Sequence, residues 1–144
     1  MKKLFVLAFD HRATFAKQLL GYPYPSLTQS QRRRVSELKR VVFDGFLHAW
    51  RGARRSKTLA VLVDEEFGVP VIRVAKRLGL ALAIPVERSG QDVFDFEHGA
   101  RFGVHLKKIK PTFAKALVRY DVARKKDNRL QRTRLLRLSR CCQK

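Results

Sequence analysis

Four short apolar runs, each followed by a charged residue, constrain the fold of this chain most strongly. They are residues 4–9 before Asp10, residues 59–63 before Asp64, residues 80–86 before Glu87, and residues 113–118 before Arg119. The runs are continuous and rich in Val, Leu, Ile and Phe, which is typical of parallel strands buried on both faces. Since the carboxyl ends of parallel strands gather on one face, we expect the four charged residues to meet in a polar site.

Helical patterns fill the segments between the runs. They cover Arg12–Leu20, Thr28–Trp50, Val71–Leu78, His98–Ile109, and a last segment from an N-cap at Asn128 through Cys142. The longest pattern has an apolar stripe of Val35, Leu38, Val41, Val42, Phe46 and Trp50. Its capping box is either Thr28 with Gln31 or Ser26 with Gln29. Gly79 is a suitable residue to end the Val71 helix.

The order β-α-α-β-α-β-α-β-α predicts an α/β fold with right-handed crossovers and a parallel sheet. Four β/α units amount to half of a (β/α)8 TIM barrel, which usually needs about 250 residues. We therefore expect a single, partial domain over residues 1–144, either an open four-stranded sheet or half a barrel. An open half exposes two edge strands, which favours a homo-oligomer or a second chain that completes the barrel.

The net charge of +20 makes nucleic acid, anionic membranes and phosphorylated metabolites candidate partners. We expect the basic runs 32–34, 39–40 and 51–57 on the polar side of the long helix and in the loop after it. Residues 122–144, with six Arg, three Lys and one Asp, form a basic C-terminal helix or tail. Aromatic residues do not interleave with these charges, so a solvated face is the default interpretation, and nucleic-acid binding would be nonspecific and salt-dependent.

Short apolar runs and adjacent cysteines indicate a cytoplasmic protein. The first run is too short for a secretory signal and is followed by no small-residue cleavage site, and no run approaches the ~18 apolar residues of a membrane span. Cys141 and Cys142 are neighbours, which disfavours a normal disulfide between them. No Cys/His spacing of the zinc type occurs. The sequence predicts neither a metal nor a cofactor nor a membrane partner.

Lys115 stands out because it interrupts an apolar strand between two alanines. Strand alternation places it on one face with Phe113 and Leu117. Its ammonium needs partners, and the carboxylates that end the other strands would supply them. A partly desolvated lysine among charges suits proton transfer or imine chemistry. A buried ion pair without a catalytic role explains the pattern equally well.

The strand-end loops carry the other candidates. His11 and Arg12 would bind an anion at the start of the next helix, or Asp10 would cap that helix with His11 exposed. Asp64 is expected to face the site, with the two following glutamates more exposed. After Glu87, a Ser-Gly segment would approach a ligand or form a plain turn. Three carboxylates would suit Mg²⁺, but the cations at positions 115 and 119 disfavour it.

Five motifs support a family resemblance. They are Phe9–Arg12 (FDHR), Leu62–Gly68 (LVDEEFG), Ile84–Gly90 (IPVERSG), Phe94–Gly99 (FDFEHG) and Pro111–Tyr120 (PTFAKALVRY). Over about residues 3–139 the chain resembles the N-terminal half of a bacterial aldolase-type domain. That domain follows a 5-dehydro-2-deoxygluconokinase domain in fused proteins of inositol catabolism. More remotely it is similar to class I tagatose-bisphosphate aldolases, which are (β/α)8 barrels.

The resemblance implies a lyase of carbohydrate metabolism. Its substrate would be a phosphorylated keto-sugar acid resembling 2-deoxy-5-keto-gluconate 6-phosphate, cleaved through a Schiff base to dihydroxyacetone phosphate and malonate semialdehyde. It implies that Asp10 orients the substrate and balances the iminium charge, and that Lys115 holds substrate hydroxyls or shuttles a proton. Glu87 would be an acid/base, and Arg119 would bind carboxylate or phosphate.

The family's imine-forming lysine lies on a later strand, in a stretch similar to Trp-Lys-Val-Glu-Gly that this sequence lacks. We therefore expect a truncated, incomplete site, unless Lys115 takes over the imine role or a second chain completes the barrel. The alternative is a non-catalytic basic protein that binds nucleic acid or another polyanion.

Overall fold

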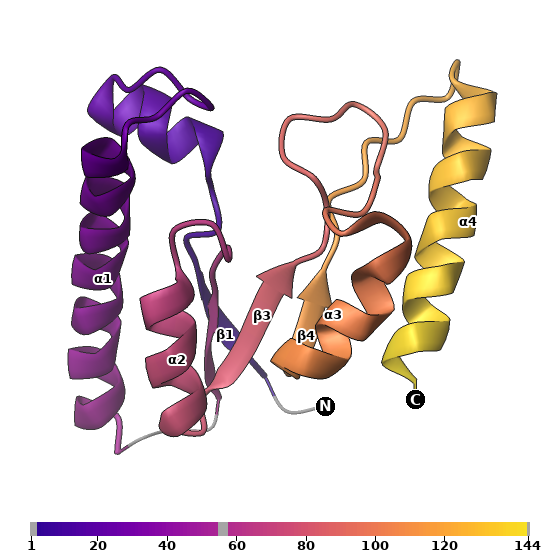
Figure 1. Cartoon of the computed structure of the whole chain (residues 1–144). Coiled ribbons are helices and arrows are strands. Elements are labelled where there is room, and N and C mark those ends of the chain that lie inside the picture. The colour runs from indigo at the N-terminus through magenta and orange to yellow at the C-terminus, as the bar shows by residue number, and fades with distance from the viewer. Residues whose placement is uncertain (1–2, 55–57, 144) are drawn as a thin grey trace. The chain divides into compact units, whose positions relative to one another are not determined.

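The computed structural model describes residues 3–54 and 58–143, which form two compact units, Met1–Ile84 and Pro85–Lys144 (Figure 1). The first unit contains β1 (Phe5–Ala8), the π-helix η1 (Phe15–Leu19), α1 (Gln29–Gly52), β2 (Leu59–Leu62), α2 (Val69–Arg77) and β3 (Ala81–Pro85), whose last residue begins the second unit. The second unit contains the 3₁₀ turn η2 (Gly99–Arg101), α3 (Phe102–Ile109), β4 (Phe113–Lys115) and α4 (Lys125–Cys142). Arg55 and Lys57, in one predicted basic run, and Lys144, in the predicted C-terminal tail, lie outside the described residues.

The predicted α/β fold is confirmed. The four strands form one parallel sheet in the order β1-β2-β3-β4 and alternate with helices, as in half of a TIM barrel. Phe5 pairs with Leu59 and Ala60 with Ala81, so the sequential strands are neighbours. Among the described residues, no helix combines the length and apolar character that a bilayer span needs.

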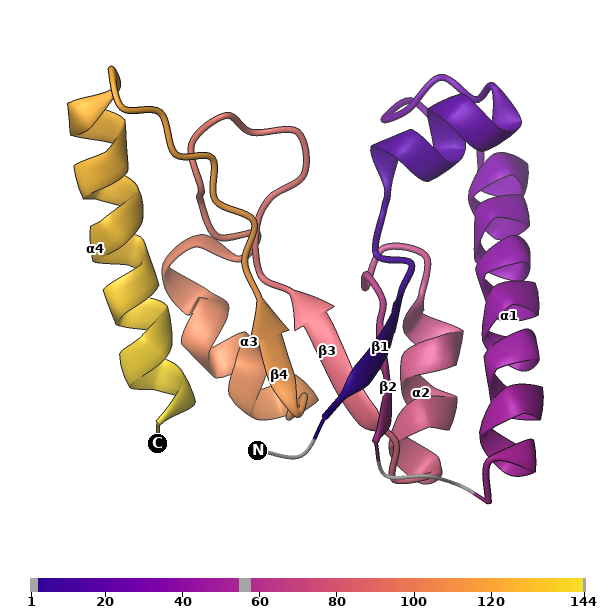
Figure 2. The same cartoon turned by 180° about the vertical axis from the view of Figure 1, so that it is seen from behind.

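The expected burial of every strand on both faces is wrong for β1 and β4. All four residues of β1 are exposed, with Phe5 exposed to 61%, and Phe113 of β4 is exposed to 46%. Helices α1 and α2 lie on one side of β1 and β2, and the two opposite views show no helix of the described part of this unit on the other side of β1 (Figures 1 and 2). By contrast, β2 has a strand on each side, and its Ala60, Val61 and Leu62 are buried.

The capping box between Thr28 and Gln31 opens α1 as predicted. The Thr28 hydroxyl accepts a hydrogen bond from the Gln31 N–H at 3.2 Å, and the Gln31 side chain accepts one from the Thr28 N–H at 2.9 Å. These two bonds satisfy backbone donors that would otherwise lack partners in the first turn. Thr28 rather than Ser26 therefore begins this helix.

The buried stripe of α1 differs from the predicted one. It consists of Val35, Lys39, Phe43, Leu47 and Trp50, which repeat at steps of three or four residues. Two predicted members, Val41 and Val42, are exposed, and Leu38 and Phe46 are half-buried. The prediction assigned Lys39 to the polar side and joined Val35 to Trp50 through Leu38, Val42 and Phe46, so it also left out the apolar residues Phe43 and Leu47, which lie on the side of Lys39.

Gly79 adopts a φ of +65° just after α2, as expected of a C′ glycine. The starts of three helices differ from the prediction. Helix α2 begins at Val69 instead of Val71, and α3 begins at Phe102, after the 3₁₀ turn η2, instead of at His98. Helix α4 begins at Lys125 instead of after Asn128. The Asn128 amide nitrogen donates to the Asp121 carbonyl at 2.6 Å and so secures the turn that precedes the helix.

Aromatic packing forms the core of the second unit. The rings of Phe96 and Phe102 stack with centroids 3.8 Å apart, and Phe94 meets Phe96 edge-on at 5.1 Å. Buried Gln131 of α4 accepts a hydrogen bond from the Phe94 N–H and donates one to the Arg119 carbonyl. This amide joins α4 to the segments on either side of β4.

The corrected stripe of α1 can be tested by a matched pair of alanine variants. We expect Phe43→Ala to lower the free energy of unfolding by about 3–5 kcal/mol, because it removes a fully buried ring. Val41→Ala, on the exposed side, should change it by less than about 0.5 kcal/mol. Urea unfolding followed by circular dichroism measures both. Equal losses would refute the assigned stripe.

Candidate functional site

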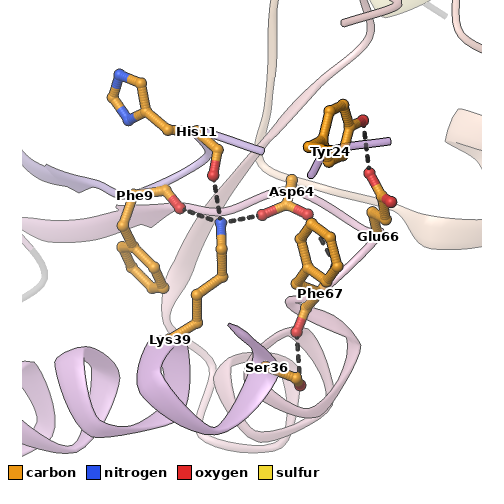
Figure 3. A network of polar contacts seen from close by, with 8 residues as sticks. All are labelled: Phe9, His11, Tyr24, Ser36, Lys39, Asp64, Glu66 and Phe67. Carbon is orange, nitrogen blue, oxygen red and sulfur yellow. Dashed lines mark hydrogen bonds and ion pairs between the residues drawn. The ribbon is translucent and has the colours of Figure 1, made fainter. Parts of the chain in front are cut away.

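A buried lysine connects α1 to the carboxyl ends of two strands in the first unit (Figure 3). The Lys39 ammonium donates to the Asp64 carboxylate just after β2, to the Phe9 carbonyl at 2.7 Å and to the His11 carbonyl at 3.0 Å. Both side chains of the ion pair are completely buried. Three acceptors therefore match the three N–H groups of the ammonium.

The loop after β2 holds Asp64 in place. Its second carboxylate oxygen accepts a hydrogen bond from the Phe67 N–H at 2.9 Å, and the Phe67 carbonyl accepts one from Ser36 of α1 at 2.8 Å (Figure 3). A Cβ atom at Gly68 would lie 2.3 Å from both the Asp64 carbonyl and Val63. The LVDEEFG motif therefore needs glycine at its last position for this tight return of the backbone.

Burial shifts both groups of the pair toward their neutral forms. Desolvation lowers the pKa of Lys39, and the charge and hydrogen bond of Asp64 oppose this, as does the charge of Asp10. Desolvation likewise raises the pKa of Asp64, against the charge and hydrogen bond of Lys39. The Lys39 ammonium also lies 5.2 Å from the ring centroid of Phe15, a favourable cation–π contact.

The structure corrects two expectations about this network. Lys39 was placed with Arg40 on the polar side of the long helix, but it belongs to the buried stripe because Asp64 and two carbonyls satisfy its charge there. Asp64 was expected to face an open site, but its two oxygens are used by Lys39 and Phe67. Glu65 and Glu66 are more exposed than Asp64, as expected.

A second lysine–carboxylate pair lies at the strand ends of the second unit. The Lys115 ammonium at the end of β4 lies 2.5 Å from Oε1 of Glu87, two residues after β3. The Val86 N–H donates to the Lys115 carbonyl at 2.8 Å, which holds the two segments side by side. An isolated bridge between Glu87 and Phe96 fixes the other side of the loop.

This pair differs from the Lys39 pair in exposure. The Lys115 side chain is exposed to 31% and that of Glu87 to 11%, so a small molecule can reach the amine. A carboxylate in hydrogen-bond contact can take up or return a proton of the lysine. The arrangement therefore has the parts needed for proton transfer or for attack of an amine on a carbonyl. Its ammonium also makes Glu87 a poor ligand for a cation.

The other predicted site residues are distributed over the two units. In the first, Asp10 and Arg12 are half-buried and act electrostatically on Lys39, and His11 is exposed. In the second, the Arg119 guanidinium donates to the Gln91 carbonyl, in the loop that follows Glu87. The meeting of Asp10 with Lys115, which belong to different units, stays a prediction.

Lys39 is the residue that sequence reasoning missed. The signal that would have found it is spacing, because it lies four residues after Val35 and four before Phe43, both buried. A lysine at the centre of an otherwise apolar stripe implies a buried carboxylate partner. Among the strand-end carboxylates, Asp64 fills that role.

Breaking the buried ion pair should lower the free energy of unfolding far more than breaking a surface ion pair. We expect Asp64→Asn to lower the free energy of unfolding by about 3–5 kcal/mol, because it leaves a buried ammonium without its counter-charge. Asp44→Asn removes the exposed ion pair with Arg40 on the same helix and should cost at most about 0.5 kcal/mol.

Urea unfolding measures these variants together with Lys39→Met and the double variant Lys39→Met/Asp64→Asn. The double variant should lose less free energy of unfolding than the two single variants lose together, since neither charged group is left without its partner. Additive losses would show that the two side chains do not interact.

The two shifted pKa values have opposite consequences for stability. Because the pKa of Lys39 is lowered, its contribution to the free energy of unfolding is full above pH 10.5, the ordinary pKa of lysine. This contribution is lost as pH falls through the pKa of the folded state. Because the pKa of Asp64 is raised, its contribution to the free energy of unfolding is full below pH 3.8, the ordinary pKa of aspartate. This contribution is lost as pH rises through the pKa of the folded state.

Titration followed by NMR of ¹³C-labelled lysine tests the first shift. The Cε signal of Lys39 should titrate at a pH below 10.5, the ordinary pKa of a lysine. Titration of Lys39 at or above 10.5 would contradict the effect of burial.

Comparison with known proteins gives one match. A family model described as "Uncharacterized protein conserved in bacteria (DUF2090)" matches residues 1–144. No curated protein and no solved structure matches the chain. Because the match spans its whole length, this protein belongs to the DUF2090 family of bacterial proteins.

Proposed function

We propose that this protein is a class I aldolase-type lyase of carbohydrate metabolism, acting on a phosphorylated keto-sugar acid. The observation that carries the proposal is the accessible Lys115–Glu87 pair at the carboxyl ends of β3 and β4. In β/α folds this edge of the sheet is where active sites lie. The five motifs that resemble an aldolase-type domain include both residues.

The chemistry would begin with attack of the neutral Lys115 amine on the substrate ketone. Glu87 would take the proton that the ammonium loses and would return protons as the carbinolamine loses water. The resulting iminium draws electrons from the neighbouring carbon–carbon bond, and Glu87 would take the proton of the hydroxyl on the far carbon as that bond breaks, which leaves an aldehyde product and an enamine on Lys115. Glu87 would then give this proton to the enamine carbon, and hydrolysis of the new iminium by water would release the ketone product and restore the lysine. No cofactor is required.

Other residues would assist this reaction. Arg119 would bind the substrate's carboxylate or phosphate. Asp64 would act indirectly, by fixing Lys39 and the loop ends after β1 and β2. The exposed apolar edge strand β1 favours a second chain that completes the barrel, since unpaired edges invite pairing.

Reductive trapping tests this function. Incubation with dihydroxyacetone phosphate and sodium borohydride should reduce an imine to a stable secondary amine on Lys115, which peptide mass spectrometry locates. Lys115→Arg should abolish the adduct, whereas Lys108→Arg, at an exposed position on α3, should leave it unchanged. Glu87→Gln should slow its formation and alter its pH dependence. An adduct spread evenly over exposed lysines, in folded protein, would refute the proposal.

A second candidate function is polyanion binding. Four cations, Lys125, Lys126, Arg129 and Arg132, are exposed on the N-terminal half of α4. A gel-shift series with a 20-residue RNA in increasing KCl tests it. Binding that survives moderate salt and depends on sequence would favour a nucleic-acid role. Affinity that falls steeply with salt and ignores sequence would reflect charge alone.

A further inference from the structure

A groove between α3 and α4 of the second unit has features of an anion site. It has a volume of about 400 Å³. Its lining consists of Ala100, Phe102, Gly103, Val104 and Lys107 from η2 and α3, and Arg137, Arg140 and Cys141 from α4. A groove of this size is typical of small-molecule sites. Its residues are separate from the Lys115–Glu87 pair.

Three cations line this groove: Lys107, Arg137 and Arg140. Among the residues that the structure describes, no carboxylate lies within 4 Å of their charged nitrogens. By contrast, Arg134 of the same helix lies 3.3 Å from Asp95, and Arg124, just before the helix, lies 2.8 Å from Asp127. An anion in the groove would therefore meet charges that these carboxylates do not neutralise.

Arg137 is held in position by aromatic rings. Its guanidinium lies 5.6 Å from the centroid of Phe102 and 5.9 Å from that of Phe96, and the two rings stack on each other. Cation–π contacts restrict a side chain that would otherwise sample many rotamers. Less conformational entropy is then lost when a ligand binds.

The geometry of the two helices brings the charges together. Arg137 and Arg140 are three residues apart on α4 and so lie on the same side of that helix, and Lys107 faces them from α3. Like charges that line one groove repel each other, and an anion between them would offset the repulsion. Phe102 is 7% exposed, so its ring cannot serve as a stacking platform for the bases of RNA.

We propose that the α3/α4 groove binds a small phosphorylated ligand with at least two negative charges. Lys107 and Arg140 contact its phosphate oxygens, and Arg137, fixed over the Phe96–Phe102 stack, supplies a bidentate contact. Val104 and Ala100 offer apolar surface to the rest of the ligand. The inference is independent of the aldolase-type function, since it uses none of the residues assigned to that reaction.

Calorimetric titration of the full chain with inorganic pyrophosphate, at 150 mM KCl, tests the site. We expect saturable one-to-one binding. Lys107→Gln and Arg140→Gln should each weaken it about tenfold, the effect of losing one charge-assisted contact. Lys76→Gln removes the same charge from the last turn of α2, outside the groove, and should change the dissociation constant less than about twofold.

Alkylation of Cys141 by iodoacetamide locates the bound ligand. Cys141 lines the groove, and its neighbour Cys142 does not. Pyrophosphate should slow the alkylation of Cys141 and leave that of Cys142 unchanged. This readout does not depend on how well any variant folds.

Three results would overturn the proposal. One is the absence of saturable binding by the folded chain. Another is equal weakening by Lys76→Gln and the two groove variants, which would indicate general attraction to a basic surface. The third is displacement of pyrophosphate by a 20-residue RNA that binds more tightly and protects Cys141, which would assign the groove to nucleic acid.

Discussion

The ammonium of Lys39 ties α1 to the segments that leave β1 and β2, and the first unit depends on this contact. Removing an ammonium and a carboxylate from water costs several kcal/mol each, which their attraction offsets only with good geometry. Here the two carbonyls of Phe9 and His11 complete the hydrogen bonding of the ammonium. The pair therefore fixes which way α1 faces and where the loops carrying Asp10 and Arg12 begin.

Two lysines thus meet two carboxylates at strand ends, and their surroundings separate their roles. Lys39 and Asp64 are sealed from solvent, so they serve the architecture. Lys115 and Glu87 are partly open to solvent, where the proposed function would place a substrate. An accessible amine beside a carboxylate is the feature on which the aldolase-type proposal rests, and the fully buried pair supports the same sheet without taking part in the chemistry.

Much of the fold could be predicted from the sequence because local signals agreed with it. The four apolar runs became the four strands, and the Thr28 capping box began α1 where expected. The sequence also indicated that Lys115 needs a carboxylate partner, but it did not choose Glu87 from among the strand-end carboxylates. The burial of Lys39 could not be predicted from hydrophobicity, because its charge is compensated by groups 25 to 30 residues away. The exposure of β1 depends on its edge position, which a continuous apolar run does not reveal.

The division between a structural and a reactive lysine can be measured directly by trace acetylation of the native protein. Mass spectrometry compares the rate at each lysine with its rate in the urea-unfolded chain. The account predicts that Lys39 reacts only after unfolding, whereas Lys115 reacts in the native protein. It would be contradicted if Lys39 in the native protein reacted as fast as exposed lysines, or if Lys115 were as protected as Lys39.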